Sequence, residues 1–173
     1  MDEIIIGKLN KVTVKNFAAF IPMDLTKHLK KSEYAFIGAG ITTPEGLLPV
    51  GSAVCRVKDS KTERILCLEW LLVDPEYRNR GVADELMQAV YGLANETEAD
   101  YIQVVLKGDF AKGKVFQNLR SFFADYNFIL VGAKKDKSEV YLGSEPYEYI
   151  EKDYFPDRWL EPEMEIREAG FVE

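Results

Sequence analysis

The sequence has few of the side chains that build disulfide frameworks or metal centres. Its 173 residues include two cysteines, Cys55 and Cys67, and one histidine, His28. None of the three has a neighbour at a metal-ligand spacing, and two cysteines make no disulfide framework. We therefore expect a reduced protein without a metal site, for which the cytoplasm is the default location.

Long hydrophobic runs and a basic leader are missing as well. The longest weakly charged stretch, residues 34–56, is interrupted by Pro44, Gly46 and Pro49, whereas a membrane-spanning helix needs about 20 apolar residues in succession. The chain opens on Met1-Asp2-Glu3, which lacks the positive charge of a secretory leader. These absences predict a protein without a membrane partner.

Positive charge is scarce. Lysine and arginine total 22 against 29 aspartates and glutamates, a net charge of −7. This balance argues against nucleic acid or an anionic membrane as the main partner, and it is compatible with a cationic small molecule or a basic peptide. The acidity is uneven, because residues 144–173 contain ten acidic and three basic side chains while residues 1–143 are neutral. The total charge therefore says little about the substrate.

The length is that of one ordinary domain, and 47% hydrophobic residues are enough for a packed core. We assign residues 1–143 to the domain and residues 144–173 to an acidic C-terminal arm. The aromatic residues of the arm are Tyr147, Tyr149, Tyr154, Phe155, Trp159 and Phe171. This density favours an arm docked on its own domain. Exchange between the subunits of a homodimer and a linker to a further domain are the alternatives.

Hydrophobic periodicity predicts a mixed α+β domain. Apolar runs predict strands at residues 4–14, 34–41, 48–58, 64–73, 101–106, 128–133 and 139–142. Helical spacing predicts helices over residues 82–94 and 115–126, and one or two short helices within residues 16–32, where Asp24 is a suitable cap. The strand–helix–strand run over residues 64–106 predicts a right-handed parallel crossover. The remaining strands are expected to pair antiparallel.

The stretch that carries chemistry lies where the strand ending at Val73 passes into the next helix. A short loop follows the strand, and Gly81 opens directly into the helix. The first turn of a helix has unpaired backbone N–H groups and partial positive charge, and a glycine lets an anion approach them. Arg78 and Arg80 add formal charge, and Ala83 keeps the next turn small. The pattern predicts a phosphate-binding loop; the alternative is an ordinary joint with two solvated arginines.

The run Arg78-Asn79-Arg80-Gly81-Val82-Ala83 resembles the arginine/glutamine-x-x-glycine-x-glycine/alanine signature of the GNAT superfamily of acyl-CoA-dependent N-acetyltransferases. The preceding Val73-Asp74-Pro75-Glu76-Tyr77 is also typical of that family. The element order over residues 4–143 is similar to the GNAT fold. The resemblance implies a mixed, mostly antiparallel sheet with a splayed central parallel pair and flanking helices.

The resemblance also implies how acetyl-CoA binds. The pantetheine arm would bond to the exposed backbone of Leu71, Leu72 and Val73. The pyrophosphate would be held by the backbone N–H groups of Arg78, Asn79, Arg80, Gly81, Val82 and Ala83. The reaction would be direct transfer of the acetyl group from the thioester to an amine.

Direct transfer needs a base, because an amine is mostly protonated at neutral pH. Strict alternation along the strand places Cys67, Glu69, Leu71 and Val73 on one face. Glu69 is the one acid inside this apolar run, and burial would raise its pKa toward the working range. We therefore take Glu69 as the base, acting through water. The alternative is a glutamate that is exposed at the strand edge or paired with a base on a neighbouring strand.

Several positions depart from the family pattern. Cys67 stands where histone-type members have a glutamate base, and Phe123 stands where many members have a proton-donating tyrosine. Tyr126, one helical turn from Phe122, is the candidate acid, with burial in the core as the alternative. Asn127 replaces a glycine at the helix end and tolerates left-handed backbone.

We interpret the other chemically reactive side chains as structural. His28 is expected on a helix surface, and Cys55 and Cys67 are expected to be small apolar strand residues rather than nucleophiles. The aromatic candidates for lining an acceptor cleft are Tyr34, Phe36, Trp70 and Tyr141. Aromatic residues on strands usually belong to the core, which is the alternative for all four.

These observations predict an N-acetyltransferase that moves the acetyl group of acetyl-CoA to a primary amine of a small molecule or peptide. The alternative, from another class, is a GNAT-fold module that binds CoA or a protein partner with little or no catalysis. Glu69 favours the enzyme, and Phe123 favours the binding module.

Overall fold

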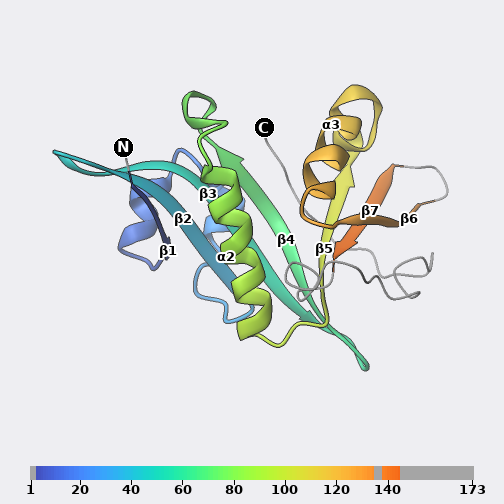
Figure 1. Cartoon of the computed structure of the whole chain (residues 1–173). Coiled ribbons are helices and arrows are strands. Elements are labelled where there is room, and N and C mark those ends of the chain that lie inside the picture. The colour runs from blue at the N-terminus through green and yellow to red at the C-terminus, as the bar shows by residue number, and fades with distance from the viewer. Residues whose placement is uncertain (1–2, 135–137, 145–173) are drawn as a thin grey trace.

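A computed structural model describes residues 3–134 and 138–144, which form a seven-stranded mixed sheet flanked by helices (Figure 1). The strand order is β1-β2-β3-β4-β5-β7-β6. The strands are β1 Ile4–Lys8, β2 Tyr34–Thr43, β3 Gly46–Asp59, β4 Arg64–Val73, β5 Tyr101–Lys107, β6 Ile129–Ala133 and β7 Glu139–Ser144. The helices are α1 Met23–Thr26, α2 Val82–Glu96 and α3 Gly113–Ala124, with 3-10 helices η1 Thr13–Phe17, η2 Pro75–Tyr77 and η3 Gly108–Ala111. The predicted fold class is confirmed.

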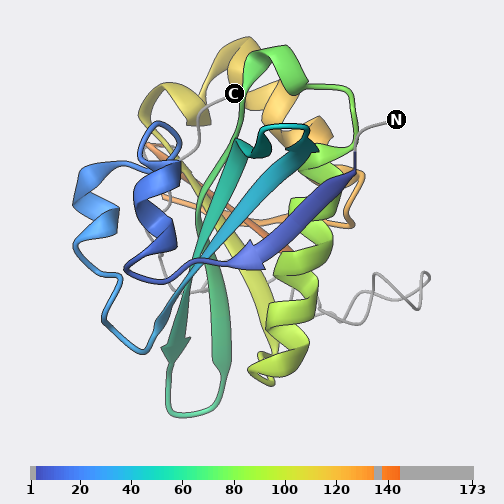
Figure 2. The ribbon, with the colours of Figure 1, turned by 90° about the vertical axis from the view of Figure 1, so that its left-hand side faces the viewer.

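The helices form a layer on each face of the sheet. Figure 2 shows α2 on one side and the short N-terminal helices on the other. The apolar residues of α2 recur every three or four positions, so Leu86 and Val90 are buried together in the main core, to which α3 also contributes. On the opposite face, Phe17 of η1 packs with Phe36 and Val54 of the sheet. The sheet is therefore covered on both sides near its centre.

Strands β4 and β5 are parallel, but they pair along only part of their length. Their Cα partners are Ile65 with Tyr101, Leu66 with Ile102 and Cys67 with Gln103. Strand β4 then continues to Val73 beside β3 alone. The central pair therefore splays into a fork, as predicted. We call residues 64–67 of β4 its paired half and residues 68–73 its open half.

A β-bulge interrupts β4 at the start of the open half. Val54 of β3 pairs with Trp70, and the next residue, Cys55, pairs with Leu68. Glu69 is consequently an extra residue on the β4 side of the ladder. Such an insertion bends the strand and re-aims the side chains that follow it.

The bulge makes one sequence prediction wrong. Leu71 and Val73 join Leu68 in the main core under α2 and α3, whereas Cys67 belongs to a cluster on the opposite face. The three residues predicted to share a face with Glu69 are thus divided between two faces. Side chains alternate between the two faces of a regular strand, and the extra residue at position 69 shifts this alternation by one position. The residues after the bulge therefore lie on the face opposite to the predicted one.

The N-terminal strand is shorter than predicted. It ends at Lys8 rather than at Val14. The Asn10 side chain accepts hydrogen bonds from the backbone N–H groups of Val12 and Thr13, at 2.8 and 3.0 Å. This local turn stops the extended chain, and Val14 lies in η1 instead.

Three expectations about helix ends have different outcomes. Pro22, not Asp24, is the N-cap of α1, and Asp24 lies in the first turn. The helix predicted over residues 115–126 begins earlier and ends earlier, at Gly113 and Ala124, and Val115 in its first turn is 42% exposed. Asn127 has a φ of 66°, so the left-handed conformation expected at this position is confirmed.

The predicted C-terminal arm lies outside the described residues, apart from Ser144 at the end of β7. Within residues 3–134 and 138–144, no helix is long and apolar enough to cross a bilayer. The same residues contain no group of histidine, cysteine, aspartate and glutamate side chains arranged to hold a metal ion.

Candidate functional site

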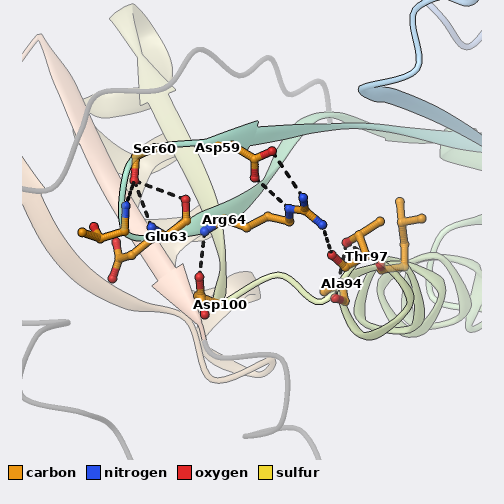
Figure 3. A network of polar contacts seen from close by, with 9 residues as sticks. Asp59, Ser60, Glu63, Arg64, Ala94, Thr97 and Asp100 are labelled. Atoms are coloured by element: carbon orange, nitrogen blue, oxygen red, sulfur yellow. Dashed lines mark hydrogen bonds and ion pairs between the residues drawn. The ribbon is translucent and has the colours of Figure 1, made fainter.

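The closed end of the β4–β5 fork is held by Arg64 (Figure 3). Its backbone N–H donates to Asp100 Oδ2 at 2.7 Å, and its carbonyl accepts from the Asp100 N–H at 2.7 Å. Its guanidinium donates to both carboxylate oxygens of Asp59 and, at 2.8 Å, to the carbonyl of Thr97. These bonds join the start of β4 to the end of α2 and to the residue before β5.

The open end of the fork borders a cleft of about 430 Å³. Its lining residues are Leu71, Val73, Arg78, Asn79, Gly81, Ala83, Asp84, Leu119, Phe122 and Phe123. We call it the Gly81 cleft. Strand β4, the following loop, the start of α2 and helix α3 each supply a wall. Six of the nine residues predicted to bind acetyl-CoA are therefore brought together around one cavity.

The other three predicted residues are not among those that line the cleft. Leu72 pairs with Ser52 of β3. The guanidinium of Arg80 lies over the Tyr77 ring, 5.0 Å from its centroid. Val82 is buried in the main core. The predicted role of these three uses backbone groups rather than side chains, so it stays a prediction.

Left-handed backbone shapes the loop between β4 and α2. Asn79 has a φ of 64° and Gly81 a φ of 88°, a region that asparagine and glycine adopt most readily. Gly81 is the N-cap of α2, and its carbonyl accepts the first helical bond from the Glu85 N–H at 3.0 Å. The N–H groups of the turn in between have no helical acceptor and lie at the positive end of the helix dipole. The start of α2 thus lies in the cleft wall, and its role as a phosphate cradle stays a prediction.

Arg78 lines this cleft with an unsatisfied guanidinium nitrogen. Its Nε donates to the Val73 carbonyl at 3.3 Å, whereas its Nη2 is buried and makes no hydrogen bond. A buried charged donor without an acceptor is costly. A phosphate oxygen is an acceptor that matches a guanidinium well. The arrangement fits an anionic group such as the pyrophosphate of CoA.

Tyr126 bonds to a residue in the wall of the Gly81 cleft, Asp84, and does not line the Glu69 cavity. Its hydroxyl donates to Asp84 Oδ1 at 3.2 Å, and Asp84 Oδ2 accepts from Gln88 Nε2 at 2.7 Å. The Tyr126 ring packs on Phe122 with 5.4 Å between centroids, and the residue is buried. The hydroxyl therefore lies at the first turn of α2, the predicted phosphate end. Its role as catalytic acid stays a prediction.

Glu69 lines a second cavity, of about 310 Å³, which we call the Glu69 cavity. Its lining residues are Pro22, Asp24, Leu25, Lys27, His28, Tyr34, Arg56, Glu69, Trp70 and Lys107. The N-terminal helices supply one wall and four neighbouring strands supply the other. Because Glu69 and Leu71 line different cavities, the open half of β4 is shared between the two.

Glu69 is 5% exposed and forms an ion pair across the sheet. Arg56 Nε of β3 lies 3.0 Å from Glu69 Oε1, although the angle is not that of a hydrogen bond. Burial acts to lower the pKa of Arg56, but Glu69 and Tyr34 outweigh it, so this pKa is raised. The guanidinium in turn stabilises the ionised carboxylate, an effect opposite to desolvation. Pairing with a cross-strand base was the alternative interpretation, and the role of Glu69 as a base stays a prediction.

His28 belongs to the Glu69 cavity, which the sequence did not suggest. Its ring stacks on Tyr34 with centroids 4.8 Å apart, and its Nδ1 is buried without a hydrogen-bond partner. Burial lowers the pKa of His28, and the charges of Lys31, Lys27 and Arg56 lower it further. No local pattern marks this residue, because the turn that follows α1 packs on Tyr34 of β2 only in the folded chain.

The four aromatic candidates and the two cysteines lie either in the Glu69 cavity or in the core. Tyr34 and Trp70 line the Glu69 cavity, whereas the other two aromatic candidates are core residues. Cys55 and Cys67 are both buried, and burial raises the pKa of the Cys55 thiol. A thiol held in its neutral form is a poor nucleophile, so the structural assignment of Cys55 agrees with its surroundings.

The described sheet, which forks between two central parallel strands, is similar in fold to solved GNAT acetyltransferases. The model of the Acetyltransferase (GNAT) family matches residues 14–118. The chain therefore belongs to the GNAT acetyltransferase family. No curated protein matches the sequence.

Solved structures share this fold at low sequence identity. A GNAT-family acetyltransferase from Staphylococcus aureus Mu50 is 17% identical with a TM-score of 0.60, over 83% of this chain and 99% of that one. A chain of the NatC complex bound to Gag peptide and CoA is 14% identical, with a TM-score of 0.62 over 83% and 98%. AAC(6')-Iy in complex with the bisubstrate analogue CoA-S-monomethyl-acetylneamine is 19% identical, with a TM-score of 0.53 over 69% and 88%. Such likeness shows the fold alone.

Proposed function

We propose that this protein is an N-acetyltransferase that transfers the acetyl group of acetyl-CoA directly to a primary amine of a small molecule or peptide. The observation that carries the proposal is the open half of β4, which lines a cavity on each face of the sheet. One cavity has the cationic loop and helix start that suit CoA. The other has a buried carboxylate that suits an amine.

Each part of the Gly81 cleft has a role in the proposal. The β4 backbone at residues 71–73 has no β5 partner, so it bonds to the amides of the pantetheine arm. Arg78 and the backbone N–H groups up to Ala83 hold the pyrophosphate. Acetyl-CoA bound in this way directs its thioester along β4 toward the bulge at Glu69.

The Glu69 cavity supplies the acceptor in the proposal. Glu69 takes a proton from the amine through water, and the amine nitrogen attacks the carbonyl carbon of the thioester. The new C–N bond forms, the C–S bond breaks, and CoA leaves as a thiolate that must gain a proton. Phe123 is fully buried and has no proton to give, so Tyr126 remains the candidate donor.

A second candidate function is a domain that binds CoA or a protein partner without catalysis. Two observations favour it. The carboxylate of Glu69 is held by Arg56 at 3.0 Å, and the Tyr126 hydroxyl is directed to Asp84 rather than to the Glu69 cavity. Both side chains then have structural roles.

Two measurements separate the functions. Acetyl-CoA is expected to raise the melting temperature, because a ligand that binds the native state stabilises it. A panel of amines with acetyl-CoA is expected to release free thiol, monitored by a thiol reagent, beyond the rate without amine. A thermal shift without thiol release for any amine would favour the binding domain, and the absence of both would contradict the two functions.

A further inference from the structure

One apolar surface of the sheet has no helix packed in its cluster, within the part of the chain that the structure describes. Its buried side chains come from strands β4 to β7 and form a cluster separate from the main core and from the cluster under η1. They are Ile65, Cys67, Tyr101, Val105, Val131 and Tyr141. We call this surface the β5–β7 face. Helices α2 and α3 pack on the opposite side of the sheet.

The side chains of the β5–β7 face are nevertheless buried. Cys67 and Val105 are fully buried, and Tyr101, Val131 and Tyr141 are at most 3% exposed. Side chains stand roughly perpendicular to a sheet, so neighbouring strands shield their flanks, whereas a second layer shields their outer ends. All described members of the cluster lie on strands. A second layer is therefore needed over this face.

Gln103 is a polar side chain on the same face. It lies between Tyr101 and Val105 on β5, and alternation along the strand directs it to their side. It is fully buried, and among the described residues neither its amide oxygen nor its amide nitrogen has a hydrogen-bond partner. Its neighbours across the sheet are Cys67 and Gly143. Because a buried amide without partners is costly, we expect the second layer to supply a donor and an acceptor.

We propose that residues 145–173 of the same chain form this layer, with aromatic side chains over the apolar cluster and the backbone bonded to the Gln103 amide. Each residue of an extended segment other than proline has an N–H donor and a C=O acceptor, and a glutamine amide bonds to one of each. The apolar side of a helix would also cover the cluster, but its backbone groups are already paired within the helix. The unpaired amide thus favours an extended segment.

The segment begins beside the β5–β7 face. Strand β7 ends at Ser144, whose Cα partner on β5 is Ile102, and the preceding Gly143 pairs with Gln103 itself. From residue 145 to residue 173 an extended chain reaches up to about 95 Å. The distance across the face, from β4 to β6, is about 15 Å for three strand spacings. The segment is therefore long enough to cross the whole face.

The other residues outside the description do not suit this role. Residues 1–2 precede β1 at the far edge of the sheet, and residues 135–137 lie between β6 and β7. Two or three residues span at most about 11 Å, which is less than the width of the face.

The composition of residues 145–173 suits an apolar surface. Segments that stay unfolded in water contain few aromatic residues, whereas a buried aromatic side chain removes about 150–250 Å² from water. The aromatic residues of the segment are Tyr147, Tyr149, Tyr154, Phe155, Trp159 and Phe171. Length, starting point and composition together favour this segment as the occupant of the face.

Photo-cross-linking in the full chain tests the location. p-Benzoylphenylalanine replaces Phe155 in one protein and Trp159 in another, so an aromatic side chain stays at each position. We expect irradiation to link the segment to β5, β6 or β7 within one chain, as identified by mass spectrometry of the peptides. Links to another surface, or no link at all, would overturn the proposal. Links between two chains would overturn it as well, because the segment would then pack on a second copy.

The two cysteines report on opposite faces of the sheet. Cys67 belongs to the β5–β7 face and Cys55 to the main core. Replacing Phe155 and Trp159 together by aspartate in the full chain is expected to raise the rate of Cys67 alkylation by N-ethylmaleimide about tenfold or more, because the cover opens more often. The rate for Cys55 is expected to stay unchanged. An unchanged rate for Cys67 would contradict the proposal.

The matched control replaces Met23 and Leu47 together by aspartate. Both are apolar and exposed, lie outside the cluster and give the same change in net charge. The alkylation rate of Cys67 is expected to stay at its original value in this control, and an equal rise would overturn the proposal. If the substitutions at Phe155 and Trp159 raise the rates of both cysteines equally, the domain has unfolded, and the cross-links decide.

The variant Gln103→Leu tests the polar contact. If the backbone of residues 145–173 bonds to the amide, the substitution should lower the melting temperature by about 2–4 °C. Gln117→Leu on the exposed side of α3 is the control and is expected to change it little. A higher melting temperature for Gln103→Leu would mean that the amide has no partner in the folded protein, and it would overturn the proposed backbone contact.

Discussion

The paired half of β4 has a sheet partner on each side, whereas the open half pairs with β3 alone. In the paired half, Leu66 and Cys67 are fully buried, and Arg64 joins the strand to α2 and to the residue before β5. The open half begins with a bulge and borders two cavities. One strand thus combines a region built for stability with a region that leaves backbone and side chains available to ligands.

The difference shows how a stable sheet can contain a binding site. A strand without a neighbour exposes polar backbone groups, which must be satisfied by something other than the sheet. In the proposed function, acetyl-CoA supplies these bonds. The hydrogen bonds of Arg64 keep one end of the fork closed. Strand β4 therefore lacks pairing with β5 over only part of its length.

The largest expected effect on stability comes from shortening a core side chain in the paired half. Leu66→Ala should lower the free energy of unfolding by about 2–5 kcal/mol, because it leaves a cavity in a fully packed region. Leu71→Ala should cost about 2 kcal/mol or less, because Leu71 already borders the Gly81 cleft. Urea denaturation of both variants measures the difference. A larger loss for Leu71→Ala would mean that the open half is as important to stability as the paired half.

Substitutions in the open half should affect activity more than stability. If Glu69 is the base, Glu69→Gln should lower the acetylation rate at neutral pH by about 100-fold or more. The thermal shift with acetyl-CoA should stay nearly intact, because Glu69 does not line the Gly81 cleft. The control is Glu45→Gln in the exposed turn between β2 and β3. A joint loss of rate and acetyl-CoA binding would indicate a structural role with Arg56, and an unchanged rate would remove Glu69 from the mechanism.

A change at the start of α2 should affect ligand binding more than stability. Gly81→Val should abolish most of the thermal shift caused by acetyl-CoA, because a β-branched residue strongly disfavours the φ of 88° that shapes the cradle. At 100 times the dissociation constant, the ligand stabilises the wild type by about 2.7 kcal/mol. Gly92→Ala in the same helix is the control, since the added Cβ has no neighbour within 4 Å. An unchanged shift in a folded Gly81→Val protein would place the phosphate site elsewhere.

The smallest expected effect is a pH dependence at the closed end. Hydrogen bonds from Arg64 lower the pKa of Asp59 below its usual value of 3.8. This carboxylate therefore contributes stability above the usual value, and the contribution is lost as the pH falls through the lowered pKa. Asp59→Asn should be less stable than the wild type at neutral pH, and the difference should narrow below about pH 4. Denaturation at several pH values measures it. A difference that stays constant with pH would show that the charge of Asp59 is not involved.

Local patterns in the sequence were sufficient for much of the architecture. The limits of β4 were predicted correctly, and α2 begins directly after Gly81 as expected. These features depend on hydrophobic periodicity and on turn chemistry, which involve neighbouring residues. The splay of the central parallel pair, which the family resemblance implied, is confirmed. The end of β1 was missed because the Asn10 turn interrupts a run that is otherwise rich in β-branched residues.

The candidate site was predicted only in part. Six residues of the Gly81 cleft follow from a contiguous motif and the strand before it. The surroundings of Glu69 do not, because its partner Arg56 lies on another strand and His28 comes from a short helical segment far away in sequence. No spacing rule within one element connects the three.

The sequence by itself determined where the strands, the long helices and the helix start at Gly81 would form, since each depends on interactions between residues a few positions apart. Only the tertiary structure decided which side of β4 each residue would face beyond Leu68, and which charges would surround Glu69. The reason is register. One extra residue at position 69 relative to β3 reverses the facing of the residues that follow. Arg56 and Tyr34 come together because they are partners in the β2–β3 ladder, which is set by pairing between strands rather than by the order of the chain.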